Sequence, residues 1–298
     1  MPTLFEANSP RGYRQMSSPY FFLHIPRTAG TTLNSILEGH FAPEEILKFY
    51  EQADYRKHRY HTSEIFDSIR LVMGHILLGG INPPSLFGVP VRVLTFLREP
   101  VARLASEYEF QRSWKQNHLY SFLNENGISF GEYIRSTEKF LYYRGKNFMT
   151  RCISHQSDME GPYPEKALAI AKENLEKHFV FFGIQERFAE SLLMLGDLLG
   201  ISNLLHDKRN VLKEDSRMAL SAEDLATARE FNRADIELYE FACGLFEERV
   251  KALGPEFPKR VKDFVFLNGK FQKVSRLLQQ RSEASEHGNL HLPKDGRW

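Results

Sequence analysis

The sequence predicts an α/β domain in which helices cover both faces of a mostly parallel sheet. Two observations support this fold class. Short apolar runs have the length and composition of buried strands, and they lie at 20–25, 69–75, 91–97 and 179–184. Segments with helical spacing separate or follow these runs, and strands that alternate with helices are typical of a parallel sheet. Ligands bind beyond the carboxyl ends of such strands, so the residues that follow each strand are the candidates for function.

The length and composition predict one main domain. The chain has 298 residues, and 42% of them are hydrophobic, which is enough for one sizeable core. We expect the α/β domain to span 20–254. Residues 1–19 are expected to form a flexible N-terminal arm, and residues 255–298 a C-terminal extension with a polar, flexible end at 281–298.

The first strand, at 20–25, runs into the loop PRTAGTT at 26–32 and then into a helix expected over 31–41. A strand that opens through such a loop into a helix directs backbone N–H groups and the positive end of the helix dipole at one point. The loop supplies further groups that suit an anion: the charge of Arg27, the backbone of Ala29 and Gly30, and the hydroxyl groups of Thr28, Thr31 and Thr32. The alternative is an ordinary corner capped by a Thr. The motif G-x-x-x-x-G-K-[ST] is absent, which disfavours ATP or GTP.

The second strand, at 69–75, ends in the pair Gly74-His75. A His at the ligand side of a sheet is a candidate general base, because a neutral imidazole can take a proton near pH 7. The alternative is a structural His. His24 lies inside the first strand, and we expect it to support the loop by packing.

The third strand, at 91–97, is followed by Arg98 and by a helix that begins at Pro100, a residue suited to a first helical turn. Ser106 lies eight residues after Arg98. Arg103 and Ser106 are three residues apart and are expected to share a helix face. An Arg with a nearby hydroxyl suits a monophosphate, whereas the alternative is an Arg paired with a neighbouring Glu.

The remaining elements complete the sheet layers. We expect helices at 164–178, 186–200 and 221–253 around the strand at 179–184. A small hairpin around Asn268-Gly269 is expected at 264–271.

Composition excludes several classes of protein. The net charge is +1, so no overall field favours nucleic acid, and no cluster has metal-ligand spacing. Cys152 and Cys243 are the two cysteines; we expect reduced thiols, although one bridge stays open. The N-terminus lacks the apolar core of a signal peptide, and no run is long enough to span a membrane. We therefore expect a soluble, cytoplasmic protein.

Together these motifs resemble the sulfotransferases that use 3′-phosphoadenosine-5′-phosphosulfate (PAPS). The nearest likeness is to the group of the heparan sulfate 2-O- and 6-O-sulfotransferases. HIPRTAGTT at 24–32 is similar to the family's H-I-P-K-T-[AG]-G-T-[ST], and LREPVARLASEY at 97–108 is similar to L-R-[DE]-P-x-x-R-x-x-S-x-[YW]. Three shorter stretches, at 147–151, 179–188 and 235–239, also match.

The resemblance implies a P-loop-like three-layer fold and a set of residue roles. Residues 27–32 would hold the 5′-phosphosulfate of PAPS, and Arg98 and Ser106 would grip its 3′-phosphate, with PAP as the product and no metal required. His75 would be the catalytic base that deprotonates the acceptor hydroxyl. The family usually has Lys where this chain has Arg27. Since Arg is always charged, Arg27 is expected to stabilise the leaving phosphate without donating a proton.

The likeness favours a carbohydrate hydroxyl as acceptor. A basic cluster at 56–59, together with Arg112, Lys115 and His118, would suit an acidic glycan, unless these charges are only solvated. The aromatic segment at 114–143 would suit a lid. Two alternatives stay open: a nucleotide- or polyanion-binding protein without turnover, and a kinase-like phosphotransferase. The sequence does not reveal the oligomeric state.

Overall fold

The structure is a computed structural model. The residues it describes are 18–50, 67–75, 80–81, 84–86, 89–138, 141, 144–155, 166–207 and 218–288. Residues 1–17 of the expected N-terminal arm, the basic cluster at 56–59 and residues 289–298 lie outside the described residues.

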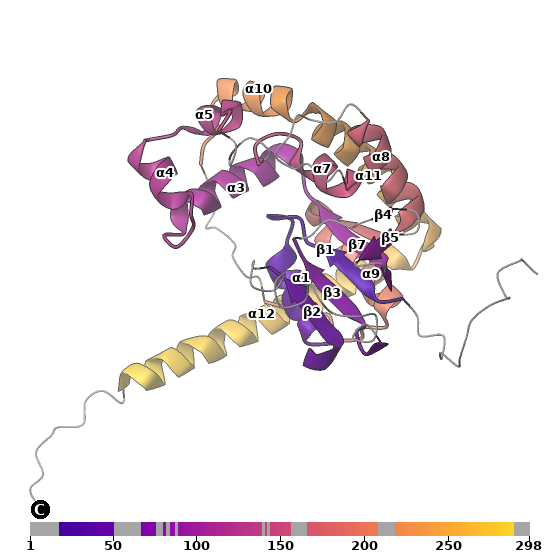
Figure 1. Cartoon of the computed structure of the whole chain (residues 1–298). Coiled ribbons are helices and arrows are strands. Elements are labelled where there is room, and N and C mark those ends of the chain that lie inside the picture. Colours follow the sequence, from indigo (N-terminus) through magenta and orange to yellow (C-terminus); the bar gives the residue numbers. More distant parts are fainter. Residues whose placement is uncertain are drawn as a thin grey trace, which may run out of the picture.

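The centre of the fold is a five-stranded, wholly parallel sheet, as the sequence predicted (Figure 1). The strand order is β2-β3-β1-β7-β8. Their bounds are β2 Ile46–Phe49, β3 Leu71–Gly74, β1 Tyr20–Leu23, β7 Arg92–Leu97 and β8 Phe179–Ile184. The sequence did not single out β2, which lies in a charged and aromatic segment and exposes Lys48. A small antiparallel sheet lies beside it, formed by β4 Gly80–Ile81, β5 Pro84–Leu86 and β6 Val89–Pro90.

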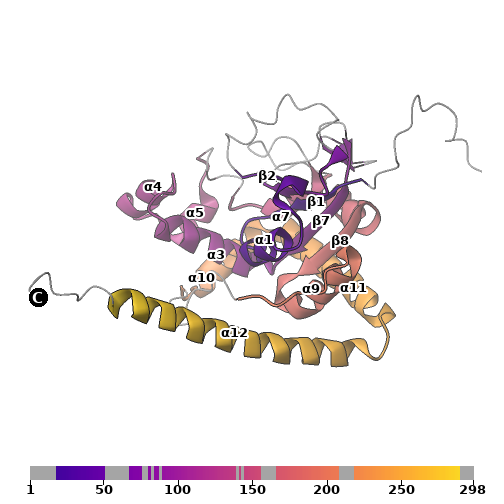
Figure 2. The same cartoon turned by 90° about the horizontal axis from the view of Figure 1, so that it is seen from below.

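Helices cover both faces of the main sheet, which gives the three layers expected of a P-loop-like domain (Figure 2). One face packs against α1 Gly30–Glu38, α9 Phe188–Leu199 and the start of α12 Phe257–Gly288. The other face packs against α7 Phe148–Ser154, α8 Ala167–Glu173 and α11 Arg233–Ala252. Side chains alternate along β1 accordingly, since Phe21 lies in one core and Phe22 in the other.

A helical layer beside the sheet has a core of its own. It contains α3 Pro100–Ser113, α4 Tyr120–Glu125, α5 Phe130–Arg135 and α10 Ala222–Phe231. Leu104, Tyr108 and Tyr133 are fully buried in it. Pro100 begins α3 as predicted, and the Glu99 carboxylate caps that helix by accepting from the N–H groups of Val101 and Ala102.

Short elements connect these layers. They are the 3₁₀ turns Pro43–Glu45 and Gln185–Arg187 and the π-helical turn Asn174–His178, which continues α8. The helix expected over 221–253 is in fact two, α10 and α11. They meet at Asn232, whose side-chain amide donates to the carbonyl of Ala228 at 3.0 Å.

The predicted hairpin at 264–271 is wrong, because this segment is part of α12. Phe257, Val261 and Phe264 recur at helical spacing and pack on the core under α1 and α9, so tertiary contacts override the local turn preference of Asn268-Gly269. Residues 281–288, which were expected to be flexible, continue the same helix.

Candidate functional site

The loop between β1 and α1 turns at two residues with left-handed backbone geometry. Arg27 and Ala29 both have a φ of 69°. Ala29 is the N-cap of α1, and its methyl group cannot accept a hydrogen bond from the first helical turn, which is formed by Gly30, Thr31 and Thr32. A helix that starts without a side-chain cap presents its dipole and its first N–H groups to a ligand. This is the geometry that the sequence predicted for an anion site.

Thr28 has a different role from the one expected for its side chain. It is fully buried, and its hydroxyl donates to the carbonyl of Ile25 at 2.7 Å. This hydrogen bond closes the loop on itself and holds it in shape. The Thr28 hydroxyl therefore braces the loop rather than facing the ligand side.

Arg27 joins the two predicted anion-binding elements. Its Nε donates to the hydroxyl of Ser106 at 3.0 Å, and Nη1 of Arg98 donates to its carbonyl oxygen at 3.1 Å. The guanidinium lies over the ring of Phe110, 4.8 Å from its centroid. Because β1 and β7 are neighbouring parallel strands, the segments that follow them meet at one edge of the sheet. The structure thus brings Arg98 and Ser106 to the loop.

Arg103 does not join Ser106 in this group, although the two were expected to share a face. Its side chain is 1% exposed. Nη2 donates to the carbonyl of Arg144 at 3.3 Å, and the guanidinium lies over the ring of Phe148. Arg103 therefore stabilises the helical layer from inside.

His75 lies at the end of β3, directly beside the loop after β1. Its Nδ1 is 2.6 Å from the carbonyl oxygen of His24. A carbonyl can only accept, so Nδ1 carries the proton and the lone pair of the neutral ring is on Nε2. The ring is exposed at one edge, and desolvation of the rest lowers the pKa of His75 below its ordinary value. An exposed, neutral imidazole of this tautomer suits a general base.

A second group beside His75 was not predicted from the sequence. Nδ1 of His24 is 3.2 Å from the hydroxyl of Tyr50, which Asn34 Nδ2 contacts at 2.8 Å. The rings of His24 and His75 lie 4.5 Å apart, and Tyr50 contacts both edge-on. The pKa of His24 is lowered to about 3, chiefly by burial and further by the charge of His75 and of Arg27. No sequence signal indicated this group, because β2, the parallel strand that Tyr50 follows at the same edge, was not predicted.

Two glycines make room for this arrangement. A Cβ on Gly30 would lie 1.6 Å from Nε2 of His24, and a Cβ on Gly74 would lie 2.3 Å from the carbonyl oxygen of Phe49. Both distances are far inside van der Waals contact, so any side chain at either position would displace its neighbour. Gly30 therefore lets the His24 ring pack against the start of α1.

Hydrogen bonds connect the shorter sequence motifs with one another and with the end of β7. Glu186 accepts from the N–H of Glu99 at 3.0 Å and from the hydroxyl of Tyr239 at 2.8 Å. The carboxylate of Asp235 is buried and accepts from the N–H and the hydroxyl of Thr150, both at 2.7 Å. These bonds link the segments at 97–108, 147–151, 179–188 and 235–239, which fixes the end of β7 against α7 and α11.

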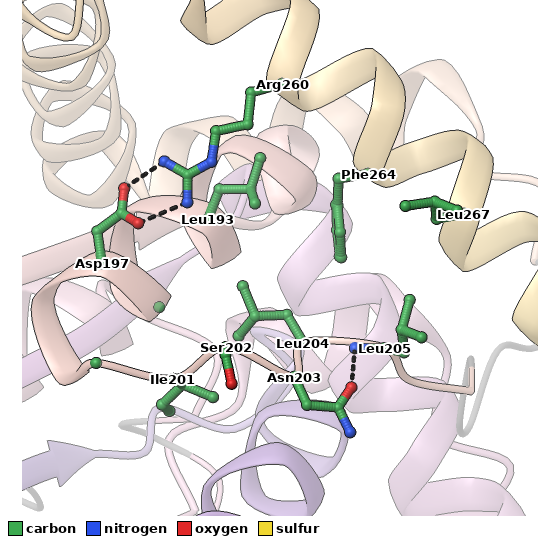
Figure 3. Close-up of a pocket in the computed structure, with 12 residues that line it drawn as sticks. Leu193, Asp197, Ile201, Ser202, Asn203, Leu204, Leu205, Arg260, Phe264 and Leu267 are labelled. Carbon is green, nitrogen blue, oxygen red and sulfur yellow. Dashed lines mark hydrogen bonds and ion pairs between the residues drawn. The ribbon is translucent and has the colours of Figure 1, made fainter.

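A cavity of about 670 Å³ lies away from this site (Figure 3). It is formed by the C-terminal end of α9, the segment at 200–205 and α12, and a bidentate ion pair between Asp197 and Arg260 closes one side. None of the predicted site residues lines this cavity.

Within the described residues, no group of His, Cys, Asp and Glu could hold a metal ion. None of the helices in this part of the chain combines the length and the apolar run that a bilayer crossing needs. Both cysteines are free; Cys152 is buried, and burial raises its pKa to about 12.

Comparison with known proteins relates the chain to sulfotransferases. A sequence model described as galactose-3-O-sulfotransferase matches residues 4–280. The chain is 24% identical over 272 residues to the galactosylceramide sulfotransferase of Bos taurus, and 22% identical over 275 residues to that of Homo sapiens. The alignments cover 84% and 85% of this chain and 62% of each relative, so the chain spans less than two thirds of their length.

Proposed function

Since this chain belongs to the galactose-3-O-sulfotransferase family, we propose that it transfers the sulfuryl group of PAPS to a hydroxyl group of a galactose-containing glycan or glycolipid. The resemblance to sulfotransferases is thereby confirmed, with this family in place of the heparan sulfate group. The galactose acceptor is taken from the family's description and from the relatives, which are galactosylceramide sulfotransferases.

The contact of Arg27 with both Arg98 and Ser106 is the observation that carries this proposal. It joins a strand–loop–helix anion site to a second basic element, at the ends of two neighbouring strands. PAPS has two separate anionic groups, and so it needs two such elements. The loop at 27–32 would take the 5′-phosphosulfate, and Arg98 and Ser106 would take the 3′-phosphate, after Arg27 shares or releases its bond to Ser106.

The reaction requires a base, a positioned sulfur and a stabilised leaving group. Nε2 of His75 takes the proton of the acceptor hydroxyl as its oxygen attacks sulfur in line. The bond between sulfur and the bridging phosphate oxygen breaks, and the electron pair leaves on that oxygen to give PAP. Arg27 and the N–H groups of the loop stabilise the negative charge that develops there, so most of the catalysis comes from positioning and electrostatics.

A comparison of PAP with ATP as ligands tests whether PAPS is the sulfuryl donor. We expect PAP to raise the melting temperature of the protein by several degrees, and ATP to leave it nearly unchanged, because only PAP offers a 3′-phosphate to Arg98 and Ser106. Arg98→Ala should abolish most of the PAP effect. A protein that responds to ATP but not to PAP would be a phosphotransferase, and this would overturn the proposal.

Turnover tests the base and the acceptor. With labelled PAPS and galactose-terminated acceptors, His75→Ala should lose at least about a hundredfold in turnover, the usual effect of removing a general base, and keep the PAP-induced rise in melting temperature. His40→Ala is the matched control, because His40 is exposed at the far end of α1. Binding of PAP without turnover on any acceptor would favour a binding protein instead.

A further inference from the structure

One flank of α12 carries a row of exposed apolar side chains. Four of them recur at intervals of 4, 3 and 4 residues, so they lie on one side of the helix and form what we name the α12 stripe: Leu267, Phe271, Val274 and Leu278. Phe266 and Leu277, which are 61% and 60% exposed, widen it on one side. Seven of the twelve large apolar side chains exposed in the described part of the chain are in α12. A concentration of this kind marks an interaction surface.

The adjacent side of α12 is fixed to the body of the protein. Asn268 is buried, and its Oδ1 accepts from the N–H of His206 at 2.9 Å. Farther along, the hydroxyl of Ser275 donates to the carboxylate of Asp207 at 2.6 Å. These contacts set the rotation of the helix and place the α12 stripe on its flank. Leu267 borders the cavity of Figure 3, whereas Val274 and Leu278, farther along, are 55% and 61% exposed.

The C-terminal part of α12 extends beyond the domain. The helix has 32 residues, which corresponds to about 48 Å. Its far end stands clear of the other labelled elements in both views (Figures 1 and 2). A helical end with an apolar side is only marginally stable in water, and so it gains from a surface that covers it.

The charge around the stripe indicates what that surface is. Between residues 264 and 282 the sequence contains Lys270, Lys273, Arg276 and Arg281 and no acidic residue, although the whole chain has a net charge of only +1. All four cationic side chains are exposed. The helical spacing places Lys270 and Arg281 next to the stripe. Long basic side chains beside an apolar stripe can place their stems on apolar material and their charges among anionic groups.

We propose that α12 docks on the surface of an anionic lipid bilayer, with the α12 stripe in the boundary of the acyl chains and Lys270 and Arg281 among the headgroups. A second copy of the chain is the rival occupant, because the 4-3-4 spacing also suits a coiled coil. The stripe covers only about two heptads, fewer than a stable coiled coil needs, and paired helices would bring like charges together. The docking does not depend on the reaction proposed above.

Vesicle co-flotation of the full chain tests the proposal. The protein should float with phosphatidylcholine vesicles that contain phosphatidylserine, much less with phosphatidylcholine alone, and less at high salt. Val274→Ser/Leu278→Ser and Lys270→Glu/Arg281→Glu should each lower the bound fraction by at least about tenfold, the effect of losing two membrane contacts. Lys251→Glu/Lys259→Glu makes the same change in net charge outside the stripe and should keep most of the binding.

Three results would overturn the docking. Absence of flotation with anionic vesicles, in a protein whose circular dichroism and melting temperature are native, is the first. The second is a concentration-dependent dimer, measured by light scattering, that Val274→Ser/Leu278→Ser abolishes while vesicles bind neither protein. The third is a similar loss of flotation in the Lys251→Glu/Lys259→Glu control, because the net charge of the protein would then explain the binding without the stripe.

Discussion

The close packing of Gly30 against His24 leads to a sharp prediction about how the site is built. In Gly30→Ala the new methyl carbon would lie 1.6 Å from Nε2 and 2.2 Å from Cδ2 of His24. Ordinary contact needs at least about 3.4 Å, so the ring must move by nearly 2 Å or leave its place. The backbone offers no obstacle of its own, because Gly30 lies in the first turn of a regular helix.

The cost follows from the contacts that the displaced ring loses. His24 stacks on Phe22 with ring centroids 5.4 Å apart, contacts His75 at 4.5 Å, and is 3.2 Å from the Tyr50 hydroxyl. Two ring contacts and one hydrogen bond are together worth about 2–4 kcal/mol. Replacing a helical Gly by Ala returns about 0.5–1 kcal/mol. We therefore expect Gly30→Ala to lower the free energy of unfolding by about 1–3.5 kcal/mol, from the difference of these terms.

A double-mutant cycle isolates this steric effect. The free energy of unfolding is measured by urea denaturation for the wild type, Gly30→Ala, His24→Ala and the double variant. In the His24→Ala background there is no ring to displace, so Gly30→Ala should become neutral or slightly stabilising there. The helix-propensity gain is the same in both backgrounds, so the expected coupling energy is that of the lost contacts, about 2–4 kcal/mol. Since His75 bonds to the main-chain carbonyl of His24, His24→Ala should keep the His75 tautomer and part of the turnover.

Additive effects of the two substitutions would refute the reasoning. So would a Gly30→Ala protein as stable as the wild type, since both results require that His24 does not occupy the space beside Gly30. Gly39→Ala, near the other end of α1, is the control for helix propensity, because a Cβ there meets the carbonyl oxygen of Ser35 at 3.3 Å, a contact that a small shift can relieve.

Three further predictions concern other parts of the molecule. Burial lowers the pKa of His155 to about 4, so its protonation favours the unfolded chain. The free energy of unfolding should therefore fall as the pH drops from about 6.5 towards 4, by about 2 kcal/mol at pH 5. Urea denaturation at pH 7 and pH 5 measures this loss, and His155→Phe should remove the part that His155 causes. Asp235→Asn leaves one N–H at the start of α7 without an acceptor and should lower the free energy of unfolding by about 2–3 kcal/mol. Asp224→Asn, at an exposed helix cap, should lower it by less than about 1 kcal/mol. Equal losses would contradict the buried role of Asp235. Arg27→Lys, which restores the residue usual in related sulfotransferases, should keep turnover within about tenfold in the labelled-PAPS assay. Arg27→Met should lose turnover, since it removes the charge; an active Arg27→Met would disprove electrostatic stabilisation by this residue.

Much of the site was predictable because its parts are encoded over a few neighbouring residues. The apolar run before Pro26 predicts a buried strand, and the small residues after it predict a loop that opens into a helix. Arg98 and His75 each follow a strand, and parallel strands present their carboxyl ends at one edge. The sequence alone was therefore sufficient to predict that these three segments meet.

The partners of individual side chains were decided only by the tertiary structure. Arg103 and Ser106 lie three residues apart, yet one points into the helical layer and the other to Arg27. Tyr50 reaches His24 only because β2 pairs with β3, which the local pattern did not indicate. The hairpin expected around Asn268 became a helix for the same reason, since packing against α9 outweighs a local preference of about 1 kcal/mol.

The sequence by itself thus determined the parallel α/β fold, the loop at 26–32 that opens into α1, and the strand ends at which the predicted site residues lie. Periodicity, capping and the helix dipole act within one or two turns of chain, and so they can be read locally. Only the folded structure determined that Arg27 joins Arg98 to Ser106, that His75 carries its proton on Nδ1, and that Val274 and Leu278 of the α12 stripe are exposed. These features depend on contacts between segments that are distant in sequence, and packing of the whole domain selects them.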